Sequence, residues 1–180
     1  MSSPSLPTVL LIIGVSGAGK TAVGRAVAER LGWDFFDGDN YHPPSNVAKM
    51  RRGEGLTDAD RAPWLDALRR LIARRLAEHA PAVLACSALK ANYRAQLRSG
   101  DPRVTIVWLD VDPETIARRL DAREGHFAGP DLLDSQFEAL EPPAPNEAVR
   151  IGAENGVDQV ARRVIDALRT ETTDGSRSDA

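Results

Sequence analysis

Short apolar runs alternate with longer amphipathic segments along almost the whole chain. The first apolar run spans residues 9–13, and the segment 20–31 after it repeats apolar side chains at Val23, Val27 and Leu31. That spacing predicts a helix with one buried face, ended by a glycine at position 32. Further β-like runs are found at residues 33–36, 82–86, 104–109 and 148–151. The alternation predicts an α/β fold of three layers, a parallel sheet with helices on both faces.

The longest amphipathic stretch begins after Thr57 and places its apolar residues on one stripe through Leu76. Thr57, with Asp60 three positions on, resembles a capping arrangement, and Pro63 is expected to kink or restart the helix. A short helical piece is expected after Pro43 and Pro44. Other helices are predicted at residues 92–98, 112–123, 131–140 and 157–168.

The length and composition limit the domain organisation. With 180 residues and 42% hydrophobic content, the chain can bury one full core, so we predict one domain over residues 8–169. Residues 1–7 and 170–180 contain few apolar side chains and are predicted to be disordered tails.

Charge and cysteine content exclude several classes of protein. A formal net charge of -3 provides no basic field for a phosphate backbone, so nucleic acid is not expected as a partner. The single cysteine, Cys86, excludes an internal disulfide and favours a reducing, cytoplasmic setting. The apolar run 9–15 is too short to span a membrane.

A glycine-rich segment follows the first predicted strand and precedes the first predicted helix. It fits the spacing G-x-x-x-x-G-K-[ST] of a P-loop, which predicts a nucleoside triphosphate held by backbone N–H groups and the helix N-terminus. Lys20 is expected to contact the outer phosphates and Thr21 to ligate Mg²⁺. The predicted nucleotide-binding residues are Gly14, Val15, Ser16, Gly17, Ala18, Gly19, Lys20 and Thr21.

Two carboxylates, Asp37 and Asp39, follow the second predicted strand. In an open α/β sheet, ligands bind beyond the carboxyl ends of the strands. One carboxylate can therefore hold Mg²⁺ through water while the other accepts the proton of an attacking hydroxyl. A solvated Asp-Gly turn is the alternative interpretation, and the adjacent P-loop favours the functional one.

Arg119 and Arg123 stand one helical turn apart, just before a glycine-containing loop. We expect residues 124–135 to form a lid with these arginines at its base. One guanidinium there can stack on the nucleotide base, a role we give to Arg119, and the other, Arg123, can stabilise charge on the transferred phosphoryl group.

Several strings of residues resemble gluconate kinases of the small P-loop type. They are Asp37-Gly38-Asp39, His42-Pro43-Pro44 with Asn46 and Lys49-Met50, Asp60-Arg61 with Pro63-Trp64-Leu65, Cys86 to Lys90 with Tyr93-Arg94, and Ser135-Gln136-Phe137. The resemblance covers about residues 9 to 145. It implies a five-stranded parallel sheet of order 2-3-1-4-5, a mobile lid, commonly a homodimer, and transfer of phosphate from ATP to the 6-hydroxyl of D-gluconate.

The resemblance also implies roles for individual residues. Asp39 matches the catalytic base, acting with Lys20 and Arg123. The candidates to bind the sugar acid are Asp39, His42, Asn46, Lys49, Arg61, Lys90 and Arg94. This agrees with the chemistry, because a polyhydroxy carboxylate needs a cation and several hydrogen-bonding side chains.

Two alternatives stay open at the level of sequence. A shikimate kinase-like enzyme shares the carboxylate pair but typically has a run of glycines after the third strand, where this chain has Cys86 to Lys90. A regulatory protein that binds ATP without an acceptor would not require the set formed by Asp39, Asn46 and Lys49.

Overall fold

The computed structural model describes residues 7–121 and 130–174. Within them, five parallel strands form one sheet in the order β2-β3-β1-β4-β5, as the resemblance implied. The strands are β1 (Val9–Ile13), β2 (Asp34–Asp37), β3 (Ala82–Ala85), β4 (Val104–Asp110) and β5 (Val149–Gly152). The helices are α1 (Lys20–Leu31), the 3₁₀ helix η1 (Gly38–Tyr41), α2 (Pro44–Arg51), α3 (Asp58–Ala77), α4 (Ala91–Arg98), α5 (Pro113–Asp121), α6 (Pro130–Ala139) and α7 (Val157–Asp174).

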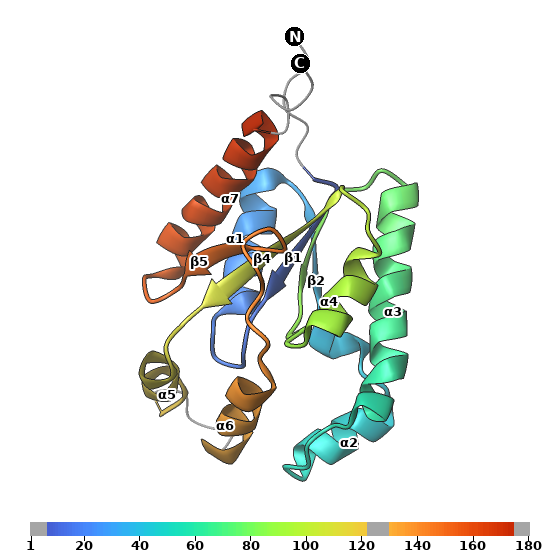
Figure 1. The fold of residues 1–180 in the computed structure, drawn as a ribbon, viewed down its shortest axis with the longest axis vertical. Helices are drawn as coiled ribbons and strands as arrows, with labels where there is room; N and C mark the ends of the chain where they lie inside the picture. The colour runs from blue at the N-terminus through green and yellow to red at the C-terminus, as the bar shows by residue number, and fades with distance from the viewer. Residues whose placement is uncertain (1–6, 122–129, 175–180) are drawn as a thin grey trace.

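The central strand β1 is buried on both faces. Leu10 and Ile12 belong to the apolar cluster beneath α1 and α7, whereas Leu11 and Ile13 belong to the cluster beneath α3 and α4. Figure 1 shows these helix pairs on opposite sides of the sheet. Burial on both faces explains why β1 is a continuous apolar run instead of an alternating one.

Helix α3 begins with the predicted capping box. The Thr57 side chain accepts a hydrogen bond from the Asp60 backbone, and the Asp60 side chain accepts one from the Thr57 backbone. The helix then continues without interruption through Pro63 to Ala77, so the predicted restart does not occur. Pro63 lies early in the helix and removes a single backbone donor there, while the buried stripe from Trp64 to Leu76 holds the helix against the sheet.

Helix α7 is longer than its apolar pattern predicted. Among the side chains whose burial is described, up to residue 170, the last buried one on α7 is Leu168, but the helix continues to Asp174. The first part of the predicted tail 170–180 is therefore helical. A formed helix gains one hydrogen bond for each residue added, so polar residues can extend it beyond the packed stripe that the pattern detects.

The carboxyl ends of the strands lie at the end of the sheet where α2, α5 and α6 gather (Figure 1). The loop between β1 and α1 and the turn after β2 both open there. No helix in the described ranges is both long enough and apolar enough to cross a membrane.

Candidate active site

The P-loop connects β1 to α1 through glycines in conformations that other residues rarely adopt. Gly17 and Gly19 have φ angles of 80° and 93°, and a Cβ on Gly14 would lie 2.9 Å from the Leu109 carbonyl oxygen. Val15 and Ala18 are buried, so they offer the site backbone groups only. The loop can therefore surround an anion with N–H groups at the N-terminus of α1, as its spacing predicted.

Lys20 lies across this loop, and its Nζ donates a hydrogen bond to the Val15 carbonyl oxygen at 2.9 Å. Burial lowers the pKa of the Lys20 ammonium, and the carboxylates of Asp39 and Asp37 oppose that shift. A half-buried cation beside two acids is suited to neutralising phosphate charge, because water screens it less than it screens an exposed one.

The two predicted carboxylates lie where β2 ends, beside the P-loop. Thr21 Oγ1 donates to Asp37 Oδ2 at 3.0 Å, while Asp37 Oδ1 accepts from the Asp39 backbone N–H at 3.1 Å. Gly38 between them packs so tightly that a Cβ there would lie 2.8 Å from the Ala85 carbonyl oxygen. The close packing that glycine allows at position 38 therefore holds both carboxylates beside the end of β3.

Two cavities meet at this point. A phosphate pocket of about 140 Å³ lies over the P-loop, and a second cavity of about 220 Å³, here called the acceptor cleft, extends toward α3 and α6. Ser16, Lys20 and Asp39 line both cavities. A group leaving the nucleotide and a group accepting it would meet beside these three residues.

His42 and Arg61 are the other predicted acceptor-binding residues that line the cleft. The His42 ring stacks on Trp64 with centroids 4.7 Å apart, and Trp64 Nε1 donates to the Gly38 carbonyl oxygen at 2.8 Å. Burial lowers the pKa of His42, with Asp39 opposing the shift, which favours a neutral imidazole at pH 7. Arg61 donates to the Leu56 carbonyl oxygen at 2.5 Å and brings a guanidinium to the cleft.

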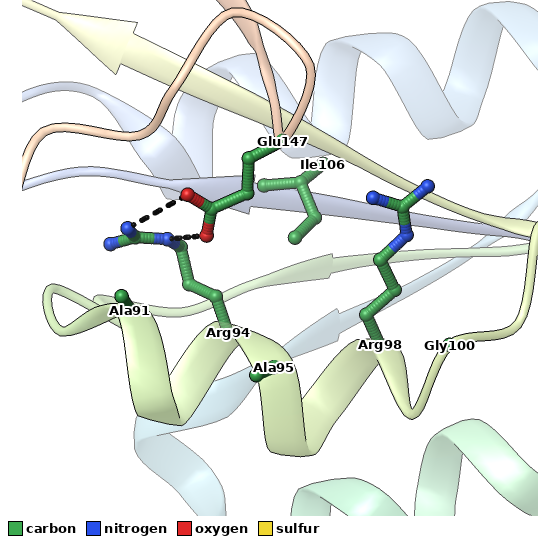
Figure 2. Close-up of a pocket in the computed structure, with 7 residues that line it drawn as sticks. All are labelled: Ala91, Arg94, Ala95, Arg98, Gly100, Ile106 and Glu147. Atoms are coloured by element: carbon green, nitrogen blue, oxygen red, sulfur yellow. Dashed lines mark hydrogen bonds and ion pairs between the residues drawn. The ribbon is translucent and has the colours of Figure 1, made fainter.

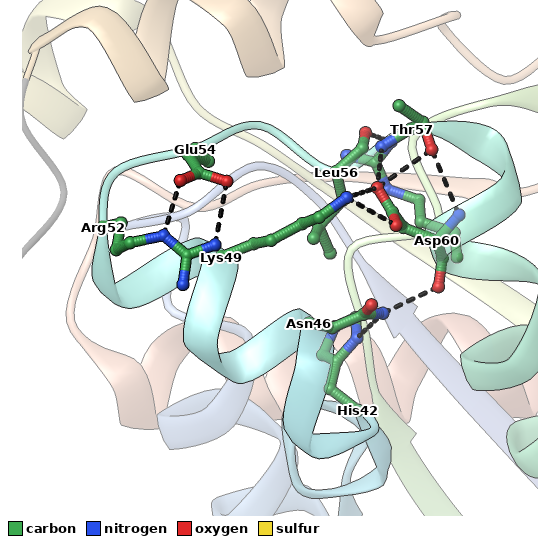
Figure 3. Close-up of polar contacts among 9 residues, drawn as sticks. His42, Asn46, Lys49, Arg52, Glu54, Leu56, Thr57 and Asp60 are labelled. Atoms are coloured by element: carbon green, nitrogen blue, oxygen red, sulfur yellow. Dashed lines mark hydrogen bonds and ion pairs between the residues drawn. The ribbon is translucent and has the colours of Figure 1, made fainter.

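Asn46 and Lys49 instead join α2 to the start of α3 (Figure 3). Asn46 is 2% exposed, and its Nδ2 contacts the Asp60 carbonyl oxygen at 2.7 Å and His42 Nδ1 at 3.3 Å. Lys49 Nζ lies 2.8 Å from both carboxylate oxygens of Asp60. These contacts and the Thr57 cap lower the pKa of Asp60 to about 2. The two residues do not line the acceptor cleft. Asn46 contacts His42 in its wall, and Lys49 pairs with Asp60 at the start of α3.

Lys90 and Arg94 also lie outside the residues that line the acceptor cleft. Lys90 Nζ contacts Asp58 Oδ1 at 2.8 Å. Arg94 is 1% exposed, and its Nε lies 2.5 Å from Glu147 Oε1 while its Nη1 donates to the Leu89 carbonyl oxygen at 2.8 Å. Figure 2 shows the guanidinium and the carboxylate facing each other beside a different pocket.

The contacts of Arg94 suggest why it is buried. It also approaches the Ala88 carbonyl oxygen at 3.4 Å, and Ala88 has a φ of 37°, a strained value for a residue with a Cβ. The buried guanidinium therefore holds the turn after β3, which places Ser87 and Leu89 in the acceptor cleft.

The two predicted lid arginines are only partly described. Arg119 donates through Nη2 to the Ala153 carbonyl oxygen just after β5. Arg123 and the predicted lid residues up to position 129 lie outside the described ranges. The end of the predicted lid, residues 130–135, forms the first part of α6.

Four polar residues that line the acceptor cleft were not among the predicted site residues: Glu54, Ser87, Ser135 and Gln136. Ser16 N donates to Gln136 Oε1 at 2.6 Å. Ser87 lies two residues beyond the buried strand β3, which ends at the site, and a place at a strand end also indicated Asp37 and Asp39. The Ser135-Gln136-Phe137 string carried part of the resemblance, so both signals were present.

The fold and the site define a P-loop kinase, with a phosphate-binding loop, a half-buried lysine and an acceptor cleft beside them. Comparison with known proteins agrees, because the shikimate kinase family model matches residues 16–169. The matched residues make up most of the domain, and shikimate kinase is the name of the family and not of this chain's substrate.

Individual relatives indicate a narrower family than the family model does. The chain is 45% identical over 166 residues to the gluconokinase of Gluconobacter oxydans, covering 92% of this chain and 93% of that protein. It is 42% identical over 177 residues to the thermosensitive gluconokinase of Escherichia coli, covering 94% and 95%. A crystal structure of a gluconokinase from Sinorhizobium meliloti superposes with a TM-score of 0.86 at 37% identity, covering 97% and 99%. The chain belongs to the gluconokinase family.

Proposed function

We propose that the protein transfers the terminal phosphoryl group of ATP to the 6-hydroxyl of D-gluconate, giving 6-phospho-D-gluconate and ADP. One observation carries this proposal: Ser16, Lys20 and Asp39 line both the phosphate pocket and the acceptor cleft. A protein that only bound nucleotide would not need the second cavity at this point. The named gluconokinases among its relatives support the choice of acceptor.

In the proposed reaction, Asp39 orients the accepting hydroxyl and takes its proton, and Lys20 stabilises charge on the phosphoryl group. Positioning and electrostatics supply most of the catalysis in phosphoryl transfer. Arg123 is proposed to add positive charge and Arg119 to contact the nucleotide base. Both arginine roles rest on their place at the predicted lid.

The residues near the phosphate pocket suit Mg²⁺. Thr21 Oγ1 and Asp37 Oδ2 lie 3.0 Å apart, and both are the hard oxygen ligands that this ion prefers. The described part of the chain contains no group of three or more His, Cys, Asp or Glu able to hold a metal. Mg²⁺ commonly takes one or two protein ligands and completes its shell with phosphates and water. Thr21 and Asp37 would hold the ion, and its charge would offset that of the phosphates.

The acceptor cleft offers the chemistry that a sugar acid needs. Arg61 supplies a cation for the carboxylate, while His42 and Ser87 supply hydrogen-bonding groups for hydroxyls. In this proposal Asn46, Lys49, Lys90 and Arg94 act by holding the walls of the cleft. A homodimer in the cytoplasm remains a prediction, from the resemblance and from the single cysteine.

A coupled assay of ADP release tests the proposal directly. The enzyme with ATP and Mg²⁺ is supplied with D-gluconate, related sugar acids, shikimate or no acceptor, and the product is identified by mass spectrometry. We expect strong turnover with D-gluconate alone. Turnover with shikimate would favour the enzyme for which the family model is named, and hydrolysis independent of any acceptor would overturn the kinase assignment.

A further inference from the structure

Gln136 lies where the phosphate pocket opens into the acceptor cleft. It comes from α6, far along the chain from the P-loop, yet its Oε1 accepts a hydrogen bond from Ser16 N at 2.6 Å. Ser16 lines both cavities, and Gln136 lines the acceptor cleft. The side chain therefore touches the P-loop at the point where a phosphoryl group would pass between substrates.

This contact fixes the orientation of the carboxamide. A backbone N–H can only donate, so the atom that faces Ser16 must be the amide oxygen and not the nitrogen. The Nε2 group, with its two N–H donors, is therefore directed away from Ser16. None of the described residues forms a hydrogen bond with Nε2, and Gln136 is partly exposed, so these donors are available to a ligand.

The chemistry of the cleft indicates what such a ligand group would be. His42 and Arg61 line the same cavity, and a polyhydroxy acid bound among them has hydroxyl oxygens that accept hydrogen bonds. A neutral amide donor suits a hydroxyl better than it suits a carboxylate, for which Arg61 provides a charged partner. A donor held by the P-loop itself would place the acceptor relative to the nucleotide.

We propose that Gln136 is a positioning residue that joins the two halves of the site: its oxygen holds the Ser16 amide while its amide N–H groups hold one hydroxyl of the acceptor. The inference rests on the proposed function. It predicts that Gln136 distinguishes acceptors that carry this hydroxyl from acceptors that lack it. A residue that only supported the P-loop would affect every acceptor equally.

The test is a double-mutant cycle between residue 136 and the acceptor. The value of kcat/KM is measured for wild type and Gln136→Met with D-gluconate and with its 2-, 3-, 4- and 5-deoxy analogues. Methionine keeps the length of the side chain and removes both polar groups. Gln159→Met is the matched control, because Gln159 is exposed on α7. Melting temperature and acceptor-free ATP hydrolysis are followed for every variant.

We expect Gln136→Met to lower kcat/KM with D-gluconate by roughly 10-fold or more. With one of the deoxy acids, the one that lacks the hydroxyl bound by Gln136, the same substitution should lower kcat/KM by less than about 3-fold. The wild type should itself have a reduced kcat/KM with that acid. Gln159→Met should match wild type throughout. The same loss on every acid would overturn the positioning role and leave Gln136 as a support of the P-loop, with the proposed function intact. If wild type transfers no phosphate to D-gluconate, the proposed function fails, and this inference fails with it.

Discussion

The phosphate pocket is built largely from one continuous stretch of chain and offers backbone groups, whereas the acceptor cleft takes side chains from separate segments. Gly17 and Gly19 shape the first with their positive φ angles. The second combines His42 before α2, Arg61 on α3 and Gln136 on α6. A motif can specify most of the first, to which β2 and its turn add Asp37 and Asp39. The second depends on how helices pack, so its chemistry can change while the phosphate chemistry stays the same.

The largest expected effect on turnover comes from Asp39, which lines both the phosphate pocket and the acceptor cleft. Asp39→Asn should lower kcat by about 10²- to 10⁴-fold, because the accepting hydroxyl loses its base, while the affinity for ADP measured by calorimetry stays within a few-fold of wild type. Asp166→Asn, an exposed change on α7, is the control. Near-normal turnover of Asp39→Asn, alongside a Lys20→Ala variant that is inactive, would show that the base is assigned wrongly.

The second prediction tests whether Arg94 supports the acceptor cleft from behind. Glu147→Ala leaves the buried Arg94 guanidinium without its carboxylate, which should lower the free energy of unfolding by about 3 kcal/mol, the low end for one partner of a buried pair because Glu147 is partly exposed. Chemical denaturation measures this loss, with the exposed Glu78→Ala as control.

Kinetics on the same Glu147→Ala variant complete that test. Well below its melting temperature, KM for the acceptor should rise only modestly, because the Arg94 side chain lies outside the residues that line the cleft. A large rise in KM with unchanged stability would instead place Arg94 among the groups that bind the acceptor.

A smaller effect is expected where β2 passes close to β3. Gly38→Ala would place a methyl group 2.8 Å from the Ala85 carbonyl oxygen and from Cys86 Cβ, and we expect a loss of about 2 kcal/mol in unfolding free energy. Turnover should fall as well, since Asp39 is the next residue. Gly156→Ala, just before α7 and outside the residues that line either cavity, meets no atom within 4 Å and should be neutral in both measurements. Equal behaviour of the two variants would refute the close packing.

The smallest predicted effect concerns the contact between α2 and α3. Lys49 and the Thr57 cap lower the pKa of Asp60 from 3.8 to about 2 in the folded state, so the stability from this carboxylate is fully present above about pH 4 and is lost as the pH falls toward 2. Asp60→Asn should therefore lower the melting temperature slightly at pH 6, and the difference from wild type should shrink by pH 2.5. A difference that does not depend on pH would exclude the carboxylate charge as its cause.

The sequence predicted the fold and the position of the P-loop between β1 and α1, for identifiable reasons. The P-loop is local, so its spacing and flanking elements specify the position of Lys20 without tertiary information. The burial of β1 on both faces followed from its continuous apolar run. The helical residues after Leu168 were missed because a hydrophobic pattern reports packing and not the hydrogen bonds that extend a helix.

The acceptor cleft was less predictable because residue type does not reveal the partner of a side chain. Lys49 and Arg94 were expected to bind the sugar acid, but in the fold each cation faces a carboxylate, from Asp60 and Glu147, respectively. Those partners lie 11 and 53 positions away along the chain. Gln136 differs from these cations: its side chain is uncharged and was not selected, yet it lines the cleft and contacts Ser16.

A crystal structure with ADP, aluminium fluoride, Mg²⁺ and D-gluconate would test most directly whether phosphoryl transfer takes place where the phosphate pocket meets the acceptor cleft. We expect the fluoroaluminate beside Ser16 and Lys20, with the 6-hydroxyl of D-gluconate within hydrogen-bond reach of the Asp39 carboxylate. D-gluconate bound elsewhere, such as in the pocket beside Arg94 and Glu147, would contradict it.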